Sequence, residues 1–155
     1  MGLIESRWSQ ETDQVMFRCL AKLYCLESCG WIEAWIDEFV QDAGDRRIGC
    51  GDHRKILERQ LKRTYGFEYE AHLRPLLISI SGLKAICLTE AAMDAGVFAK
   101  MVASLNSLKV WRDKHAHSDS VGMQTMLVSP SACRAELENA LRGLFALRRH
   151  FRRLS

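Results

Sequence analysis

Proline is almost absent from this chain, and this scarcity does most to limit the folds open to it. Among 155 residues only Pro75 and Pro130 are prolines, and there are ten glycines. Proline interrupts a helix because it lacks an amide donor and clashes with the preceding turn, so long stretches here are free to be helical. Apolar residues recur every three or four positions, and no useful length alternates as a strand does. We therefore expect an all-α fold.

Apolar periodicity predicts helices at about residues 10–42, 53–65, 68–96 and 97–115, and a last one from residue 129 onward. The apolar stripe of the first segment is wide, which predicts a central helix. Its dominant face is expected to consist of Met16, Leu20, Leu23, Trp31, Trp35 and Phe39.

Local signals predict where some of these helices begin and end. The third segment should break near Pro75 or Gly82, because both residue types interrupt helices. Ser129 is a typical N-cap, and Pro130 suits the first helical position. Amphipathic helices with brief connections favour an up-and-down bundle of four to six helices, in one domain spanning residues 1–155.

The charge of +3 is unevenly distributed. Residues 1–45 hold nine acidic and three basic residues, a formal charge of −6, which leaves +9 on residues 46–155. Such polarity suits a protein with an anionic partner on one side, although charged, solvated helix faces give the same pattern.

The cysteines and the N-terminus indicate the compartment. Residues 1–13 are polar and lack the apolar core of a signal peptide, and no apolar run approaches a membrane span. A cytoplasmic protein without a membrane partner is expected. Cys25 and Cys29 have no second pair at zinc-ligand spacing, so no structural metal is expected. Five of the six cysteines lie in apolar helical patterns, where a free thiol packs like a small hydrophobic side chain: Cys19, Cys25, Cys29, Cys87 and Cys133.

The most informative segment is residues 105–118. Continuing the stripe of Val97, Met101, Leu105 and Leu108 by one turn reaches Arg112, which would need a partner or an anionic ligand at a core-facing position.

Two histidines follow Arg112. His115 is expected on roughly the same face as Arg112, whereas His117 lies about 140° around a straight helix. Arg112 and His117 would therefore meet only if the helix frays near His115, or if a second subunit completes the site.

These residue types suit cleavage of an RNA phosphodiester. A histidine can take the proton of the ribose 2′-OH or protonate the departing 5′-oxygen, and an arginine can bind the phosphate bidentately. Asp113, four residues before His117, would orient its imidazole. Because RNA supplies its own nucleophile, neither a metal nor a cofactor is expected, and the product would carry a 2′,3′-cyclic phosphate.

The pattern of Arg112, Asp113, three variable residues and His117 resembles the HEPN superfamily, particularly its compact RiboL-PSP branch. Leu105, Leu108 and Ala116 also resemble the family, as does the first helix with Glu33 at an acidic position. The likeness covers about residues 15–150, but only the Arg-to-His motif is specific. This chain departs from the pattern at two positions: Ser118 stands where glycine is common, and Asp119 stands where some relatives have a tyrosine.

The resemblance implies a helical homodimer with two Arg-to-His motifs in one cleft and metal-independent endoribonuclease activity, often in toxin–antitoxin or antiviral systems. It implies His117 as acid/base, Arg112 as phosphate ligand and Asp113 as the orienting residue. A partner antitoxin would be possible. Relatives that have the tyrosine are regulated by its modification, so such regulation is not expected here.

Other residues are assigned supporting roles. His115 is either a second catalytic histidine or a cleft-lining residue, and Glu33 either pairs with Arg112 or is an ordinary exposed or core-edge glutamate. Candidate RNA contacts are Trp111, Lys114, Arg148, Arg149 and Arg152. Two alternatives stay open: a non-catalytic HEPN module that dimerises or binds RNA or protein, and a metal-dependent hydrolase using Asp113, His115 and His117.

Overall fold

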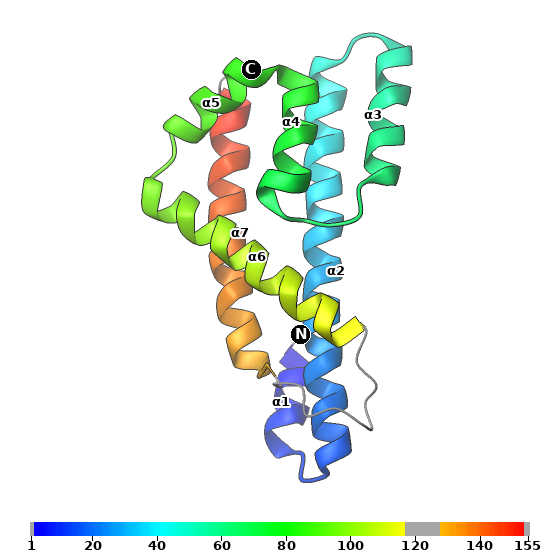
Figure 1. The fold of residues 1–155 in the computed structure, drawn as a ribbon, viewed down its shortest axis with the longest axis vertical. Coiled ribbons are helices and arrows are strands. Elements are labelled where there is room, and N and C mark those ends of the chain that lie inside the picture. The colour runs from blue at the N-terminus through cyan, green and yellow to red at the C-terminus, as the bar shows by residue number, and fades with distance from the viewer. Residues whose placement is uncertain (1, 117–127, 154–155) are drawn as a thin grey trace.

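The computed structural model describes residues 2–116 and 128–153, which form seven α-helices and one short π-helix and contain no strand (Figure 1). The expectation of an all-α bundle is confirmed, with seven α-helices in place of the predicted four to six. The elements in order are α1 (Gly2–Gln10), α2 (Gln14–Arg47), α3 (Gly51–Arg63), η1 (Tyr69–Leu73), α4 (Arg74–Ser81), α5 (Leu83–Ala91), α6 (Ala95–Ala116) and α7 (Pro130–Arg153).

Two long helices, α2 and α7, run along most of the molecule and pack on each other (Figure 1). Helix α6 crosses both obliquely, and its contact with α7 is the most extensive between any two elements. Helices α3 and α4 lie beside the C-terminal half of α2, whereas α1 lies beside its N-terminal half. The end of α6 that carries Arg112 therefore lies across the middle of α2.

The local signals account for several helix ends. Asp13 caps α2, because its Oδ1 accepts hydrogen bonds from the amides of Val15 at 2.7 Å and Met16 at 3.1 Å. The predicted N-cap of α7 is confirmed: Ser129 Oγ accepts from the Ala132 amide at 3.1 Å, and Pro130 begins the helix.

The break in the apolar stretch falls at Gly82. There φ is +79°, a conformation that glycine adopts without steric cost, and the chain bends by 119° between Tyr69–Ser81 and Leu83–Ala91. Pro75, the other predicted breakpoint, lies in the first turn of α4, and the helical chain continues through it from η1.

The predicted dominant face of α2 is only partly correct. Trp35 and Phe39 are buried, but Met16, Leu23 and Trp31 are 51%, 43% and 49% exposed. The side that packs inward is instead formed by Tyr24, Cys25, Cys29, Ile32, Ile36 and Val40, together with Trp35 and Phe39.

A small side chain lies where α6 crosses the inward face of α2. Cys29 is fully buried, and its Sγ lies 3.6 Å from the carbonyl oxygen of Leu108, to which it donates. A small residue at this position lets α6 approach the backbone of α2 closely, which a tryptophan on the other face would prevent. The inward side therefore combines large aromatic residues with a small residue where α6 crosses.

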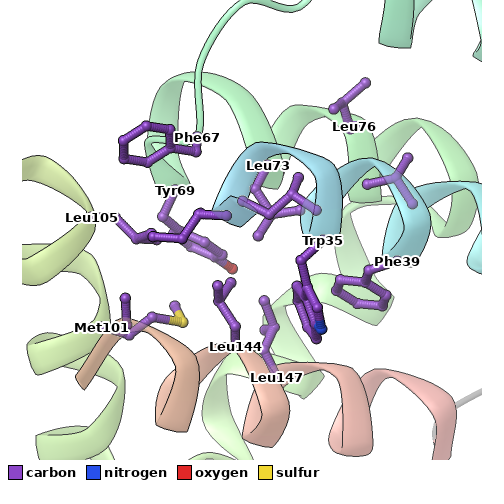
Figure 2. Close-up of a cluster of buried hydrophobic side chains, with 14 of the residues drawn as sticks. Trp35, Phe39, Phe67, Tyr69, Leu73, Leu76, Met101, Leu105, Leu144 and Leu147 are labelled. Carbon is purple, nitrogen blue, oxygen red and sulfur yellow. The ribbon is translucent and has the colours of Figure 1, made fainter. Parts of the chain in front are cut away.

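The core lies where α2, α6, α7 and the π-helix meet (Figure 2). Trp35 and Phe39 from α2 face Leu144 and Leu147 from α7, while Met101 and Leu105 close the α6 side. Phe67 and Tyr69, on the chain entering η1, are fully buried beside Leu105.

The six cysteines are all free thiols. Cys25, Cys29 and Cys133 are buried as predicted, but Cys19 and Cys87 are exposed, so the expectation that all five pack inside was wrong for these two. Both lie on the outward faces of their helices, which the wide apolar stripes did not reveal.

Among the described residues, no single helix is both long and apolar enough to cross a membrane; only Tyr69–Ser81 and Leu83–Ala91 taken together, across their bend, reach that length and composition.

Candidate functional site

Arg112 continues the inward-facing stripe of α6, as the spacing predicts. Met101, Leu105 and Leu108 are fully buried, and one turn later the side chain of Arg112 is still only 21% exposed. Its Nη1 donates to Glu33 Oε1 on α2, so the first of the two alternatives for Glu33, pairing with Arg112, is present. The ion pair offsets part of the cost of removing the guanidinium from water.

An aromatic ring also contacts the guanidinium. The Cζ of Arg112 lies 5.2 Å from the centroid of the fully buried Phe67, within the range of a cation–π interaction. Phe67 belongs to the extended segment between α3 and η1, so Arg112 is held by side chains from two elements besides its own helix. Sequence reasoning missed Phe67, because 45 positions separate it from Arg112.

Asp113 joins the same network of charges. Its Oδ1 accepts from Arg112 Nε at 3.4 Å, and its Oδ2 accepts from Lys109 Nζ one turn earlier. The hydrogen bond from Lys109 is the main cause that lowers the pKa of Asp113 below its usual value, with Arg112 adding to it. The spacing of four between Lys109 and Asp113 predicts such a pair, and sequence reasoning overlooked it.

The site therefore contains alternating charges in the order Lys109, Asp113, Arg112 and Glu33. Glu33 and Asp113 engage two of the five N–H donors of the guanidinium, at Nη1 and Nε. An anion that binds Arg112 would extend or replace these contacts. The arrangement holds a positive group at a fixed, partly exposed position.

His115 is buried, with 4% of its surface exposed. Burial lowers its pKa below the usual value, and the nearby charge of Lys22 on α2 lowers it further. Both effects favour the neutral imidazole. Helix α6 is regular through Ala116, so the described residues show no fraying at His115. His117 lies outside the described residues, so its convergence with Arg112 stays a prediction.

The two neighbours predicted to contact RNA differ in accessibility. Lys114 is exposed near the end of α6. Trp111 is partly buried and packs against the core, so its ring is less available for stacking than its position beside Arg112 indicates.

The C-terminal arginines form a second basic region. Arg148 is 18% exposed; its Nη2 donates to Asp42 Oδ2 at 3.2 Å, and its Cζ lies 5.5 Å from the Trp35 ring centroid. Arg152 donates to the same oxygen of Asp42 at 2.7 Å, and this hydrogen bond is the main cause that lowers the pKa of Asp42. Arg149 is exposed. A shallow hollow of about 480 Å³ is lined by Phe145, Arg148, Arg149, Arg152 and Arg153.

The two basic regions lie on opposite flanks of α2. Glu33, which binds Arg112, and Asp42, which binds Arg148, are nine residues apart on one helix. At about 100° per residue, nine residues correspond to about half a turn beyond two full turns. One subunit therefore does not bring Arg112 and Arg148 to the same phosphate.

Within residues 2–116 and 128–153, no group of three or more His, Cys, Asp and Glu side chains is arranged to hold a metal ion. His117, which the metal-dependent alternative requires, is not among them. No family model, curated protein sequence or solved structure matches this chain.

Proposed function

We propose that this protein is a HEPN-type, metal-independent endoribonuclease, in which Arg112 binds the scissile phosphate and His117 acts as acid and base. His117 removes the 2′-OH proton or protonates the departing 5′-oxygen; the downstream fragment leaves with a 5′-hydroxyl, and the upstream fragment retains a 2′,3′-cyclic phosphate. Arg112 stabilises the charge that develops on the phosphate. A role as a toxin or antiviral effector, with or without an antitoxin partner, follows from the same family resemblance.

The observation that carries the proposal is the position of Arg112. The core stripe of α6 ends in a guanidinium that is held by Glu33 and the Phe67 ring, yet retains an exposed fraction of 21%. A fixed orientation reduces the entropy lost when a phosphate binds. The motif Arg112–Asp113 with His117 then supplies the groups that the chemistry needs.

The free thiols support a reducing compartment, and we propose a cytoplasmic location. We also propose a homodimer, because His117 is predicted to project about 140° away from Arg112 on a straight helix. In such a dimer, each phosphate would meet Arg112 of one subunit and His117 of the other.

Cleavage of total RNA in EDTA tests the activity. Wild-type protein should cut, and Arg112→Ala should lower the rate by about 10²- to 10³-fold, a typical loss for removal of one transition-state donor. His117→Ala should abolish cleavage, whereas Arg46→Ala, an exposed arginine on α2, serves as a matched control and should cut normally. Activity that EDTA removes would favour the metal-dependent alternative.

Mixing inactive variants tests the dimer. If the two residues act across the interface, a mixture of Arg112→Ala and His117→Ala subunits contains heterodimers with one intact site, and activity partly returns. If both residues act within one chain, the mixture stays inactive.

A second candidate, a non-catalytic HEPN module, is favoured by one observation. Glu33 and Asp113 already neutralise the charge of Arg112, as they would if the arginine served only to join α6 to α2. This candidate predicts that Arg112→Ala lowers the free energy of unfolding and that no RNA is cut under any condition.

A further inference from the structure

A hollow at the end of α3 is not explained by the proposed chemistry. It has a volume of about 530 Å³, lies between the end of α3 and the start of α4, and is open to solvent. Its lining includes Gln60, Arg63, Thr64, Tyr65 and His72. The hollow thus combines hydrogen-bonding groups, a positive charge and an aromatic ring.

The aromatic ring is unusually accessible. The side chain of Tyr65 is 81% exposed, compared with 49% for Trp31 and 53% for Phe145. Exposing an aromatic ring to water forgoes the stabilisation that burial would provide. Exposed aromatic rings are the surfaces on which nucleic-acid-binding proteins stack bases, because each base presents a flat π-face.

The histidine of the hollow is fixed in place. Gly66 has φ +145°, and a Cβ at this position would lie 2.6 Å from Cε1 of His72, so the imidazole rests directly against the glycine. The Nδ1 of His72 also lies 3.4 Å from Glu68 Oε2. These two contacts orient the ring at the wall of the hollow.

The chain segment that carries Tyr65 also contacts Arg112. Phe67, whose ring contacts the guanidinium of Arg112, is two residues from Tyr65. Two residues span at most about 7 Å, so the backbone of Tyr65 lies within this distance of the backbone of Phe67, whose ring contacts Arg112.

We propose that the hollow is a base-binding subsite of the ribonuclease, in which a base of the bound RNA stacks on Tyr65. Gln60 and His72 contact the edge of that base, and Arg63 binds its phosphate. This inference rests on the proposed function, since it requires RNA at Arg112. It adds a contact to the base, whereas Arg112 contacts only the backbone.

Binding of two chemically matched probes tests the subsite. The probes are a fluorescein-labelled RNA hexamer of mixed sequence and a hexamer of the same ribose-phosphate backbone without bases. Affinities are measured by fluorescence anisotropy on the His117→Ala background, which prevents cleavage. Tyr65→Ala should weaken binding of the RNA hexamer at least about fivefold, the lower end of what stacking contributes. Binding of the base-free hexamer should not change.

Two variants serve as controls. Tyr65→Phe keeps the ring and should bind both probes like the parent protein. Trp31→Ala removes a different exposed ring, on α2, and should also bind normally. Because Tyr65 is 81% exposed, its replacement should leave the unfolding transition unchanged.

The outcomes separate the two proposals. Equal affinity of Tyr65→Ala and its parent for the RNA hexamer overturns the subsite, as does an equal loss for both probes or an absence of RNA binding altogether. Cleavage in EDTA by protein with His117 intact, and its loss in Arg112→Ala, reports separately on the enzymatic function. If the enzyme is active but its affinity for RNA does not depend on Tyr65, only the subsite is refuted.

Discussion

Gly143 lies on α7 where α6 crosses, and one added methyl group there tests the packing that positions Arg112. A Cβ at residue 143 would lie 2.3 Å from Cβ and 2.7 Å from Cγ of Met101. Non-bonded carbons prefer about 3.5–4.0 Å, so the two helices would have to separate by more than about 1 Å. The nearest atom is a Cβ fixed to the backbone of α6, so rotation of the Met101 side chain does not relieve the clash.

Two opposing effects set the expected change in the free energy of unfolding of Gly143→Ala. Overpacking a core typically lowers the free energy of unfolding by about 1–3 kcal/mol, whereas replacing glycine by alanine inside a helix raises it by about 1 kcal/mol. We expect Gly143→Ala to lower the free energy of unfolding by up to about 2 kcal/mol. Gly30 on α2 is the matched control: it is exposed, and nothing lies within 4 Å of its added Cβ, so Gly30→Ala should stabilise by about 1 kcal/mol.

Urea unfolding followed by circular dichroism measures both changes. The midpoint should fall for Gly143→Ala and rise for Gly30→Ala. If Gly143→Ala proves as stable as Gly30→Ala, then α6 does not cross α7 as closely as described, and the placement of Arg112 over Phe67 loses its basis.

Three further predictions concern capping, pH and the Arg112 ion pair. Asp13→Ala should lower the free energy of unfolding by about 1 kcal/mol in urea titrations, because its carboxylate caps two amides of α2; an unchanged midpoint would contradict the cap. Burial raises the pKa of Glu90, but hydrogen bonds from Arg74 and Tyr69 outweigh it and lower the pKa below the usual value. The contribution of Glu90 to stability is therefore present above the unfolded pKa of about 4.3 and is lost as pH falls through the folded pKa. Glu90→Gln should show a shallower acid dependence of stability than wild type; parallel curves of unfolding free energy against pH would refute this. Glu33→Gln keeps an oxygen that can accept from Arg112 Nη1 but removes the competing negative charge, so it should raise RNA affinity up to about fivefold in anisotropy titrations; weaker binding would refute this.

Much of the fold is predictable from local signals. Helical periodicity, the scarcity of proline and the Ser129–Pro130 start depend only on neighbouring residues, and the structure follows them. Helix α1 was missed because it buries none of its residues and so has no apolar stripe to detect. The inward face of α2 was misjudged because its stripe is wide, and the choice between faces depends on how closely α6 approaches at Cys29.

Part of the site was also predictable from the sequence. The stripe of α6 correctly indicates that Arg112 faces inward and needs a partner, which Glu33 supplies. The contact with Phe67 depends on the path of the chain between α3 and η1, which no local pattern encodes. The separation of Arg112 from Arg148 likewise depends on how three helices pack, so charge along the sequence alone does not reveal it.

The most direct test of the central claim is the 3′ end that the protein leaves when it cuts a defined RNA in EDTA. The account predicts a 2′,3′-cyclic phosphate on the 5′ fragment, no cut where the scissile nucleotide is 2′-deoxy, and a loss of product in Arg112→Ala. A 3′-hydroxyl end, or equal yields from wild type and Arg112→Ala, would contradict it.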